Sequence, residues 1–534
     1  MAPQHNQDRP NFVLFITDQH RADYLGCYGH PVLRTPHIDR IAHNGVRFDK
    51  FYVSSPQCQS NRSTMMTGRM PSVHGVRGAG IPLPLRSNTF VDLMRADGYE
   101  TALVGKCHLQ NIHDWAPEIL PQTFIERRDG PLNEFSEALK PIPGEDYEQE
   151  RGSLWRYRSV YRPLTDYYGF EHIDLITQHG DLGEAGYYTW LHSKGYSPEK
   201  LRGPDNTLPH DYICPEAWRT AVPEELYPTA FVEQKSVEYL ENYARKWDPK
   251  PLFMQVSFPD PHHPFTPPGR YWGMHNPDDM PLPPSFDMED DPPPHLEWSR
   301  KYTRTKGNPY HAYPATRREA QEAAALTCDM TAMVDDAVGT VLETLDRLGM
   351  SDNTVVMFTA DHADLLGDHG MVLKGPFHFQ GLLRVPFIWS DPHMRPTSES
   401  SDRVCGTIDM GQTILDRAGI APFNGMQGRS MLPLMTDPRG DWRHGLVIEE
   451  EQQHGVLGFD EPMRLNSFVT ERHRMTIYHG VEWGELYDLE EDPHECTNLW
   501  DSHNARELRR EMMEALAYER MALVDTSPFP TRLA

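Results

Sequence analysis

Three nearly continuous apolar runs constrain the fold of this chain more than any other feature. They cover residues 11–17, 251–258 and 353–360. Unbroken runs of this length indicate strands buried on both faces of a parallel sheet, because a half-exposed strand would alternate polar with apolar residues. Between the second and third runs, residues 316–348 read as one or two helices. We therefore expect an α/β protein with a parallel central sheet.

Polar side chains able to hold a metal or move a proton follow each run. In open α/β sheets, ligands bind at the carboxyl ends of the strands. A lone aspartate there is more often a turn residue, and a lone histidine is more often a packed core residue. The position of His262 and His263 alone does not decide which of the two is functional. The residues concerned are Asp18 and Gln19, His262 and His263, and Asp361 and His362.

A fourth predicted strand, residues 101–104, runs into Gly105-Lys106-Cys107-His108. In an extended segment Lys106 and His108 lie on the same side, because successive side chains alternate. Each residue alone is better explained as a solvated strand end or a packed histidine. Because both residues follow a predicted strand end, as the candidate residues of the other strands do, a functional pair is favoured.

The segment 54–69 has the layout of a reactive residue at the start of a helix. Pro56 stiffens the approach, Cys58 begins the helical pattern, and Gly68 is a stop signal. A group at a helix N-terminus meets unpaired N–H groups and the positive end of the helix dipole. Arg62 lies four residues on, on the same face as Cys58, and adds a permanent charge. The alternative is a buried structural cysteine, the commonest fate of a lone Cys.

These segments resemble the formylglycine-dependent sulfatases of the alkaline phosphatase-like superfamily. Cys58 to Arg62 resembles the C-x-P-x-R signature, with Ser60 in the place of proline, and Thr67-Gly68 resembles the T-G that follows it. Further resemblances are G-K-x-H at 105–108, H-x-P-F at 262–265, T-A-D-H at 359–362, G-D-H-G at 367–370, R-V-P at 384–386 and a C-terminal signature at 492–499. Ala363 and Phe379-Gln380 are modest departures. The pattern lies near the choline-sulfatase and phosphonate monoester hydrolase branches.

The resemblance implies a fold, a metal shell and a set of catalytic residues. The implied fold is a large mixed, mostly parallel central sheet flanked by helices, with a smaller C-terminal α+β domain. Mostly oxygen ligands suit Ca²⁺ or Mn²⁺, with Mg²⁺ possible, better than zinc. The implied metal ligands are Asp18, Gln19, Asp361, His362 and the oxygen of a formylglycine made from Cys58. The implied catalytic residues are Cys58, Arg62, Lys106, His108, His262 and Lys374.

Three functions fit this pattern. The first is a sulfuric ester hydrolase. The second is a phosphonate monoester or phosphodiester hydrolase with the same nucleophile and metal. The Lys106 and His108 pair favours the first, because the phosphonate hydrolases tend to carry neutral groups there. The third is a binding protein with Cys58 unconverted, against which the full set of metal-type residues argues.

A change in the sequence pattern after about residue 430 predicts the domain organisation. We expect a catalytic domain at 1–430, with an aromatic-rich insertion at about 109–225 over the carboxyl edge of the sheet. We expect a smaller domain at 431–534, with strands at 445–451, 467–478 and 485–489 and a closing helix at 506–522.

The composition of the chain limits its expected binding partners and its expected cellular location. The formal charge of −27 opposes binding to nucleic acid and to acidic membranes. It also repels an anionic ester at long range, so an anion site must build its own positive pocket. Seven scattered cysteines, an N-terminus without an apolar core and no long apolar run predict a cytoplasmic protein without a membrane span. The expected substrate is a small anionic ester, and the expected assembly is a homodimer or homotetramer.

Overall fold

The computed structural model describes residues 9–114, 138, 145–158, 160–287, 292–301, 312–394, 400–452, 457–459 and 462–532. The polar start of the chain, and part of the predicted insertion including Trp115, lie outside these residues. In the part of the chain that is described, no helix is long and apolar enough to cross a membrane.

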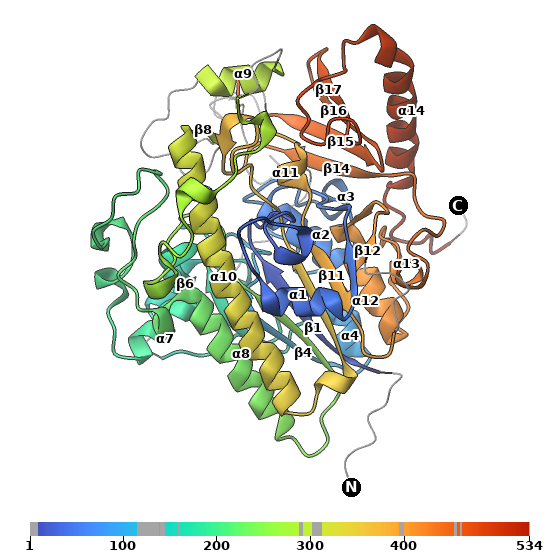
Figure 1. Ribbon diagram of the computed structural model, residues 1–534. Helices are drawn as coiled ribbons and strands as arrows, with labels where there is room; N and C mark the ends of the chain where they lie inside the picture. Colours follow the sequence, from blue (N-terminus) through green and yellow to red (C-terminus); the bar gives the residue numbers. More distant parts are fainter. Residues whose placement is uncertain are drawn as a thin grey trace, which may run out of the picture.

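A nine-stranded mixed sheet forms the centre of the molecule (Figure 1). Its order is β12-β2-β11-β9-β1-β7-β4-β5-β6. The inner strands β9, β1, β7, β4 and β5 run parallel, whereas β11 and β6 are antiparallel to their neighbours. The bounds are β1 Asn11–Thr17, β2 Val46–Phe48, β4 Glu100–Lys106, β5 His172–Thr177, β6 Glu184–Ala185, β7 Leu252–Ser257, β9 Thr354–Ala360, β11 Phe387–Ser390 and β12 Ser400–Ser401.

The three apolar runs form the central strands β1, β7 and β9, as predicted. Every residue of β1 and β7 is buried. Phe12 and Leu14 point into one hydrophobic core and Val13 and Phe15 into another, because successive side chains of a strand face opposite ways. Burial on both faces is therefore the physical reason for the unbroken apolar runs.

Helices cover both faces of the sheet (Figure 1). One core is closed by α1 Pro36–His43, α8 Pro228–Ala244 and α10 Arg317–Arg347. The other is closed by α2 Cys58–Thr67, α4 Phe90–Ala96 and α12 Met410–Ala418. The remaining α-helices of the described residues are α3 Pro71–His74, α6 Gly152–Arg156, α7 Gly186–Ser193, α9 Pro294–Lys301, α11 Gln380–Leu383, α13 Leu432–Thr436 and α14 Arg506–Ala522.

A smaller antiparallel sheet follows near the C-terminus, in the order β14-β15-β16-β17. Its strands are β14 Gly445–Glu451, β15 Arg464–Thr470, β16 His473–Tyr478 and β17 Gly484–Asp488. Leu446, Phe468 and Met475 of this sheet belong to the same apolar core as β1 and α2. Two further two-stranded pairs are β3 Phe51–Tyr52 with β13 Cys405–Gly406 and β8 Tyr313–Pro314 with β10 Met371–Val372.

The structure refines three expectations in detail. Residues 316–348 form one helix, α10, because Thr316 caps its start and no proline interrupts it. The internal Gly339 does not end the helix, and its face packs against His37. Residues 467–478 form two strands with a tight turn at Glu471 and Arg472. The predicted insertion is not wholly outside the sheet, because β5 pairs in parallel with β4 along Ala102–Lys106. The domain boundary at 430 stays a prediction.

Gly105 shows how closely β4 and β7 approach one another. Its φ of 116° lies in a region that L side chains rarely adopt, and a Cβ there would overlap the carbonyl oxygen of Ser257. Gly98 also has a positive φ, 92°, but a Cβ there would meet nothing within 4 Å.

We therefore expect Gly105→Ala to destabilise the protein far more than Gly98→Ala. The left-handed penalty of about 1–2 kcal/mol applies to both variants, and overpacking adds about 1–3 kcal/mol for Gly105→Ala alone. Denaturant unfolding of the two variants beside the parent measures the difference. Equal losses in the free energy of unfolding would contradict this account of Gly105.

Candidate active site

The pairing of β1 with β9 places the first two acidic residues side by side. Thr17 and Ala360 are partners in the register, so Asp18 and Asp361 leave the sheet together. The Asp361 amide donates to the Thr17 carbonyl at 3.1 Å, and both aspartate side chains are fully buried. Residues 343 positions apart thus meet at one point, as the strand-end argument predicts.

Arg62 of α2 joins these two carboxylates. Its Nε donates to Asp361 Oδ2 at 2.7 Å, and its Nη2 lies 3.4 Å from Asp18 Oδ2. Its Nη1 donates to the Lys106 carbonyl and to Ser257 Oγ, both at 3.0 Å. All three guanidinium nitrogens are therefore engaged inside the protein. Arg62 contributes charge and fixes the site, rather than presenting a free fork to an anion.

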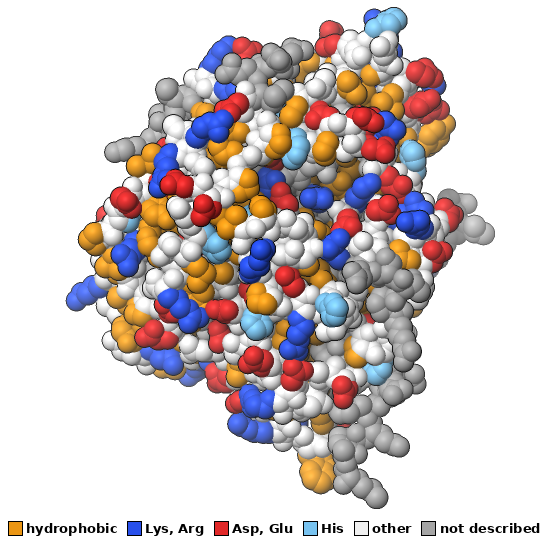
Figure 2. All heavy atoms as spheres, in the orientation of Figure 1, with side chains coloured by type: hydrophobic (Ala, Val, Ile, Leu, Met, Phe, Trp, Pro, Cys, Tyr) orange, Lys and Arg blue, Asp and Glu red, His pale blue; other side chains and the backbone are white. Residues whose placement is uncertain are grey.

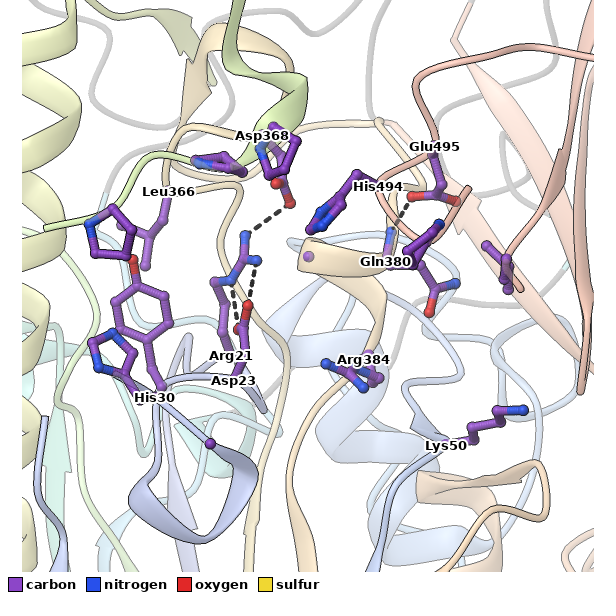
Figure 3. A pocket seen from close by; sticks show the side chains of 18 of the residues that line it. Arg21, Asp23, His30, Lys50, Leu366, Asp368, Gln380, Arg384, His494 and Glu495 are labelled. Atoms are coloured by element: carbon purple, nitrogen blue, oxygen red, sulfur yellow. Dashed lines mark hydrogen bonds and ion pairs between the residues drawn. The ribbon is translucent and has the colours of Figure 1, made fainter. Parts of the chain in front are cut away.

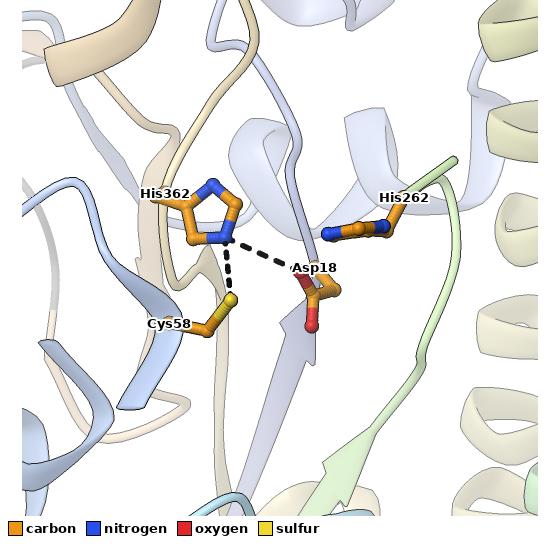
Figure 4. Close-up of side chains that lie close together, drawn as sticks. All are labelled: Asp18, Cys58, His262 and His362. Atoms are coloured by element: carbon orange, nitrogen blue, oxygen red, sulfur yellow. Dashed lines mark hydrogen bonds and ion pairs between the residues drawn. The ribbon is translucent and has the colours of Figure 1, made fainter. Parts of the chain in front are cut away.

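Cys58 is the first residue of α2 and lies at the centre of the site (Figure 4). Its Sγ is 2.9 Å from Lys374 Nζ and 3.1 Å from His362 Nε2. Burial alone would raise the pKa of this thiol, but the charges of Lys374 and His362 hold that pKa well below its ordinary value. Of the seven cysteines, this one is therefore placed for reactivity.

Lys374, His262, His179 and Lys106 form a chain of contacts beside Cys58. Lys374 Nζ lies 3.1 Å from His262 Nε2. The His262 ring stacks on the His179 ring at a centroid distance of 3.5 Å and an angle of 10°. His179 Nε2 is 2.6 Å from Lys106 Nζ, which in turn forms an ion pair with Asp18 Oδ2. Burial, with the charge of Lys374, lowers the pKa of His262 to about 4.

His179 is not among the site residues predicted from the sequence. It follows β5, which ends at Thr177, so the strand-end criterion that identified Asp18 and Asp361 applies to it too. From the sequence, residues 109–225 are expected to be an insertion, so no strand end is expected among them. Recognising residues 172–177 as a strand was the signal that could have found it.

His108 follows Lys106 by two residues, but it does not continue the extended segment of Lys106. The chain turns at His108, where φ is 59°, and β4 ends at Lys106. The buried Glu150 carboxylate causes this turn by accepting the amide hydrogens of His108, Leu109 and Gln110 at 2.6, 2.8 and 3.0 Å. The expectation that Lys106 and His108 share one side of a strand is therefore wrong.

The two neighbouring histidines have separate positions. His262 belongs to a buried group with Asp18, Cys58 and His362, whose ligand atoms all lie within 4.8 Å of one another. His263 Nδ1 instead lies 3.0 Å from Gln19 Nε2. Gln19 Nε2 also donates to the Asp364 carboxylate, so these contacts fix the orientation of the Gln19 amide.

Two buried oxygens in the site suit a cation. Gln19 Oε1 and Asp18 Oδ1 have no hydrogen-bond donor among the described residues, although His362 Nε2 lies 3.4 Å from Asp18 Oδ1. Buried acceptors normally find a donor. Two orphaned oxygens beside an imidazole and residue 58 therefore fit the oxygen-rich donor set of a hard divalent ion.

Comparisons with known proteins agree with this geometry. The family model described as Sulfatase matches residues 10–126 and 165–420. A model described as N-sulphoglucosamine sulphohydrolase, C-terminal, matches residues 367–522. An arylsulfatase of Clostridium perfringens is 27% identical over 509 residues, which cover 93% of this chain and 92% of the relative. A choline-sulfatase of Rhizobium meliloti is 24% identical over 505 residues, 92% and 82% of the two chains.

Solved structures show the same fold. A phosphonate monoester hydrolase of Agrobacterium radiobacter superposes with a TM-score of 0.74 at 23% identity, over 98% of both chains. The family models, the relatives and the converging strand ends lead to one conclusion: this chain belongs to the sulfatase family, with an alkaline phosphatase-like fold, and is a sulfuric ester hydrolase.

Proposed function

We propose that this hydrolase cleaves sulfate esters with a formylglycine made from Cys58 and one divalent metal ion. The observation that carries the proposal is the group of Asp18, Cys58, His262 and His362, which come from four distant segments and place their ligand atoms within 4.8 Å of one another. The position of Cys58 at the N-terminus of α2 adds the positive end of a helix dipole.

Asp18, Gln19, Asp361 and His362, with the oxygen of residue 58, would hold the ion. The orphaned oxygens of Asp18 and Gln19 support this assignment. The two Asp361 oxygens accept hydrogen bonds from Arg62 and from the Gln19 and His362 amides, which fix this carboxylate. Ca²⁺ or Mn²⁺ suits such a donor set, and Mg²⁺ is the third choice. When bound, the ion would add positive charge opposite the ester oxygens.

Cys58 Sγ stands where a formylglycine oxygen would lie. The hydrated aldehyde supplies a hydroxyl nucleophile in place of the thiol. Lys374 Nζ, 2.9 Å from Sγ, places a positive charge beside the attacking atom. Lys106, fully buried, adds charge on the side of Asp18, so the pocket is locally positive in a chain of net charge −27.

The remaining residues serve proton transfer. The contact of 3.1 Å between Lys374 Nζ and His262 Nε2 supports this pair as the source of the leaving-group proton. His108 is the base for the second proton transfer, which releases sulfate. In support, His108 Nδ1 is a buried atom without a hydrogen-bond partner among the described residues.

Peptide mass spectrometry across Cys58 tests the nucleophile. From a host able to perform the conversion, we expect an aldehyde in place of the thiol, with hydrolysis of an aryl sulfate in proportion to the converted fraction. Cys58→Ala is the matched control and should be inactive. Ser60→Pro, which restores the usual residue of the signature, should still be converted. Full activity in protein whose Cys58 is entirely thiol would sink the proposal.

The alternative is a phosphonate monoester or phosphodiester hydrolase with the same nucleophile and metal. Gln19 and His362 in the ligand set resemble both the choline-sulfatase and the phosphonate monoester hydrolase branches and keep this alternative open, whereas Lys106 with His108 favours the sulfatase. We expect kcat/KM for 4-nitrophenyl sulfate to exceed that for 4-nitrophenyl phenylphosphonate, measured side by side on one preparation. The reverse order would assign the phosphonate as the preferred substrate.

His179 is expected to act as a positioning residue through two separable contacts. His179→Phe keeps a ring against His262 but removes the ring nitrogen that contacts Lys106, which keeps its ion pair with Asp18. We therefore expect kcat to fall about tenfold, a fraction of the 10²–10⁴ of a general acid, with an unchanged dependence on the leaving group. His179→Gln keeps a polar partner for Lys106 but removes the stack. We expect His179→Gln to make the rate depend more steeply on the leaving group. His262→Ala should have the same effect, and a stronger one.

A series of aryl sulfates with leaving groups of different pKa measures this dependence, and thermal unfolding controls for stability. Identical behaviour of His179→Phe and His179→Gln would rule out separate roles for the two contacts.

The cytoplasmic location and the assembly into a homodimer or homotetramer stay predictions.

A further inference from the structure

Asp364 is a buried carboxylate that has no role in the chemistry proposed above. It follows β9 in the chain and is 1% exposed. Its Oδ2 accepts a hydrogen bond from Gln19 Nε2. Its Oδ1 accepts the main-chain N–H groups of Leu366 at 2.8 Å and of Leu373 at 2.9 Å. One carboxylate oxygen is therefore engaged by a residue proposed to hold the ion, and the other by the residue before Lys374.

The contact with Gln19 decides which end of that amide faces the cation site. An ionised carboxylate only accepts hydrogen bonds, so the amide nitrogen, and not the amide oxygen, has to face Asp364. Gln19 Nε2 also lies 3.0 Å from His263 Nδ1, but an imidazole nitrogen can donate or accept and would tolerate either end of the amide. Asp364 is therefore the group that leaves Gln19 Oε1, a buried atom without a donor among the described residues, for the ion.

The contact with Leu373 acts on the lysine beside Cys58. Leu373 has a φ of 70°, a left-handed conformation that residues other than glycine rarely adopt. Asp364 accepts its N–H, and its carbonyl accepts the N–H of Leu365 at 3.1 Å. The next residue is Lys374, whose Nζ lies 2.9 Å from Cys58 Sγ. The backbone conformation that directs Lys374 to residue 58 is therefore held on one side by Asp364.

A different residue holds the main chain around Asp364. Arg21 Nη1 donates to the carbonyls of Asp364 and Leu365, at 3.3 and 2.7 Å. The same guanidinium pairs with Asp23 and Asp368, each at 2.8 Å. Figure 3 shows Arg21 between these two aspartates. A change from acid to amide in the side chain of residue 364 should therefore leave the path of the loop in place.

We propose that Asp364 is a positioning residue that sets the proposed metal ligand Gln19 and the turn carrying Lys374 together. The same carboxylate orients an oxygen toward the ion and fixes a cation beside residue 58. Groups that orient metal ligands contribute strongly to affinity, and their loss typically costs about 10–100-fold. This inference rests on the proposed function, because it takes the metal site that includes Gln19 as given.

Replacing the acid by its amide tests the orientation of Gln19. In Asp364→Asn, Oδ1 still accepts the two main-chain N–H groups, and Nδ2 faces Gln19 Nε2. Two donors then oppose one another, so the Gln19 amide turns over and places its nitrogen where Oε1 stood. Isothermal titration of the full chain with Mn²⁺, and with Ca²⁺ in a second series, should show a loss of affinity of about 10–100-fold.

A second substitution should reverse this loss. When Gln19→Glu is added to Asp364→Asn, the new carboxylate accepts from the new amide and still offers an oxygen to the ion, and the net charge equals that of the parent. The affinity should return to the order of magnitude of the parent. A merely structural role of Asp364 would instead make the two losses add. Gln19→Glu alone opposes two carboxylates, so in metal-free buffer it should unfold at a lower temperature than the double variant.

Two control variants address the other carboxylates of the chain. Acidic side chains are spread over the face shown in Figure 2, and in a chain of net charge −27 they add weak binding of divalent ions. Asp368→Asn removes a buried carboxylate of the same loop, whose partner is Arg21. Asp336→Asn changes the other group of the described residues that could hold an ion, which Asp336 forms with His37 and Asp335. Both controls should leave the tight site unchanged.

The link to Lys374 has its own readout. Asp364→Ala removes the acceptor of the Leu373 N–H, whereas Asp364→Asn keeps it. With the ion saturating and rates divided by the converted fraction of Cys58, kcat for 4-nitrophenyl sulfate should be about tenfold lower in Asp364→Ala than in Asp364→Asn, because Lys374 loses its position beside residue 58. Thermal unfolding of each variant controls for stability.

The proposal is overturned if Asp364→Asn binds both ions as tightly as the parent, if Gln19→Glu adds to the loss, or if Asp368→Asn loses as much affinity. If the double variant does not fold, the comparison of Asp364→Asn with Asp368→Asn decides. Equal kcat values of Asp364→Ala and Asp364→Asn would overturn the link to Lys374.

Failure of this inference can be told apart from failure of the proposed function. A parent protein that binds neither ion would overturn the metal site and, with it, the role of Asp364. A parent that binds the ion and hydrolyses the sulfate ester, but whose affinity does not respond to Asp364→Asn, would retain the proposed function and lose only this inference.

Discussion

The guanidinium of Arg62 between Asp18 and Asp361 is the interaction on which the site depends. Two aspartates that are fully buried and adjacent would repel each other and bear a large desolvation cost. Arg62 forms ion pairs with both carboxylates, and it also donates hydrogen bonds to the Lys106 carbonyl and to the Ser257 hydroxyl. It thereby links the ends of β1, β4, β7 and β9 to α2. The helix that carries Cys58 is fixed to the sheet by the same residue that makes the paired carboxylates tolerable.

The C-terminal sheet is part of this arrangement and does not stand apart from it. Gln57, the residue before Cys58, donates through Nε2 to Glu450 of β14 at 3.2 Å. The buried His378 bridges Ser467 of β15 and Glu450 of β14, at 2.7 and 2.9 Å. The buried Arg474 pairs with Glu485 and Glu495, and Glu495 accepts the first amide of α11. The position of residue 58 therefore depends on contacts made some 390 residues later in the chain.

Electrostatics explains how an acidic protein can serve an anionic substrate. The net charge of −27 is a property of the whole chain, and salt screens its long-range effect over about 8–10 Å. Inside the site, Arg62, Lys106 and Lys374 are buried or nearly so, where their fields are screened far less. In the site, this local pattern of pairing, and not the overall charge, decides which ligand sign is favoured.

The sequence alone determined the central strands, because burial on both faces requires unbroken apolar runs, and it determined that Asp18 and Asp361 meet, because parallel strands end at one edge. The helix that begins at Cys58 and its end at Gly68 were also predicted from the local sequence. Only the tertiary structure showed His179 stacked on His262, the turn of His108 around Glu150, and the engagement of every Arg62 nitrogen. The strand end at residues 172–177 could have indicated that His179 lies near the site. The stacking of its ring, the turn and the Arg62 contacts depend on side-chain packing between distant segments, which no periodicity or spacing reveals.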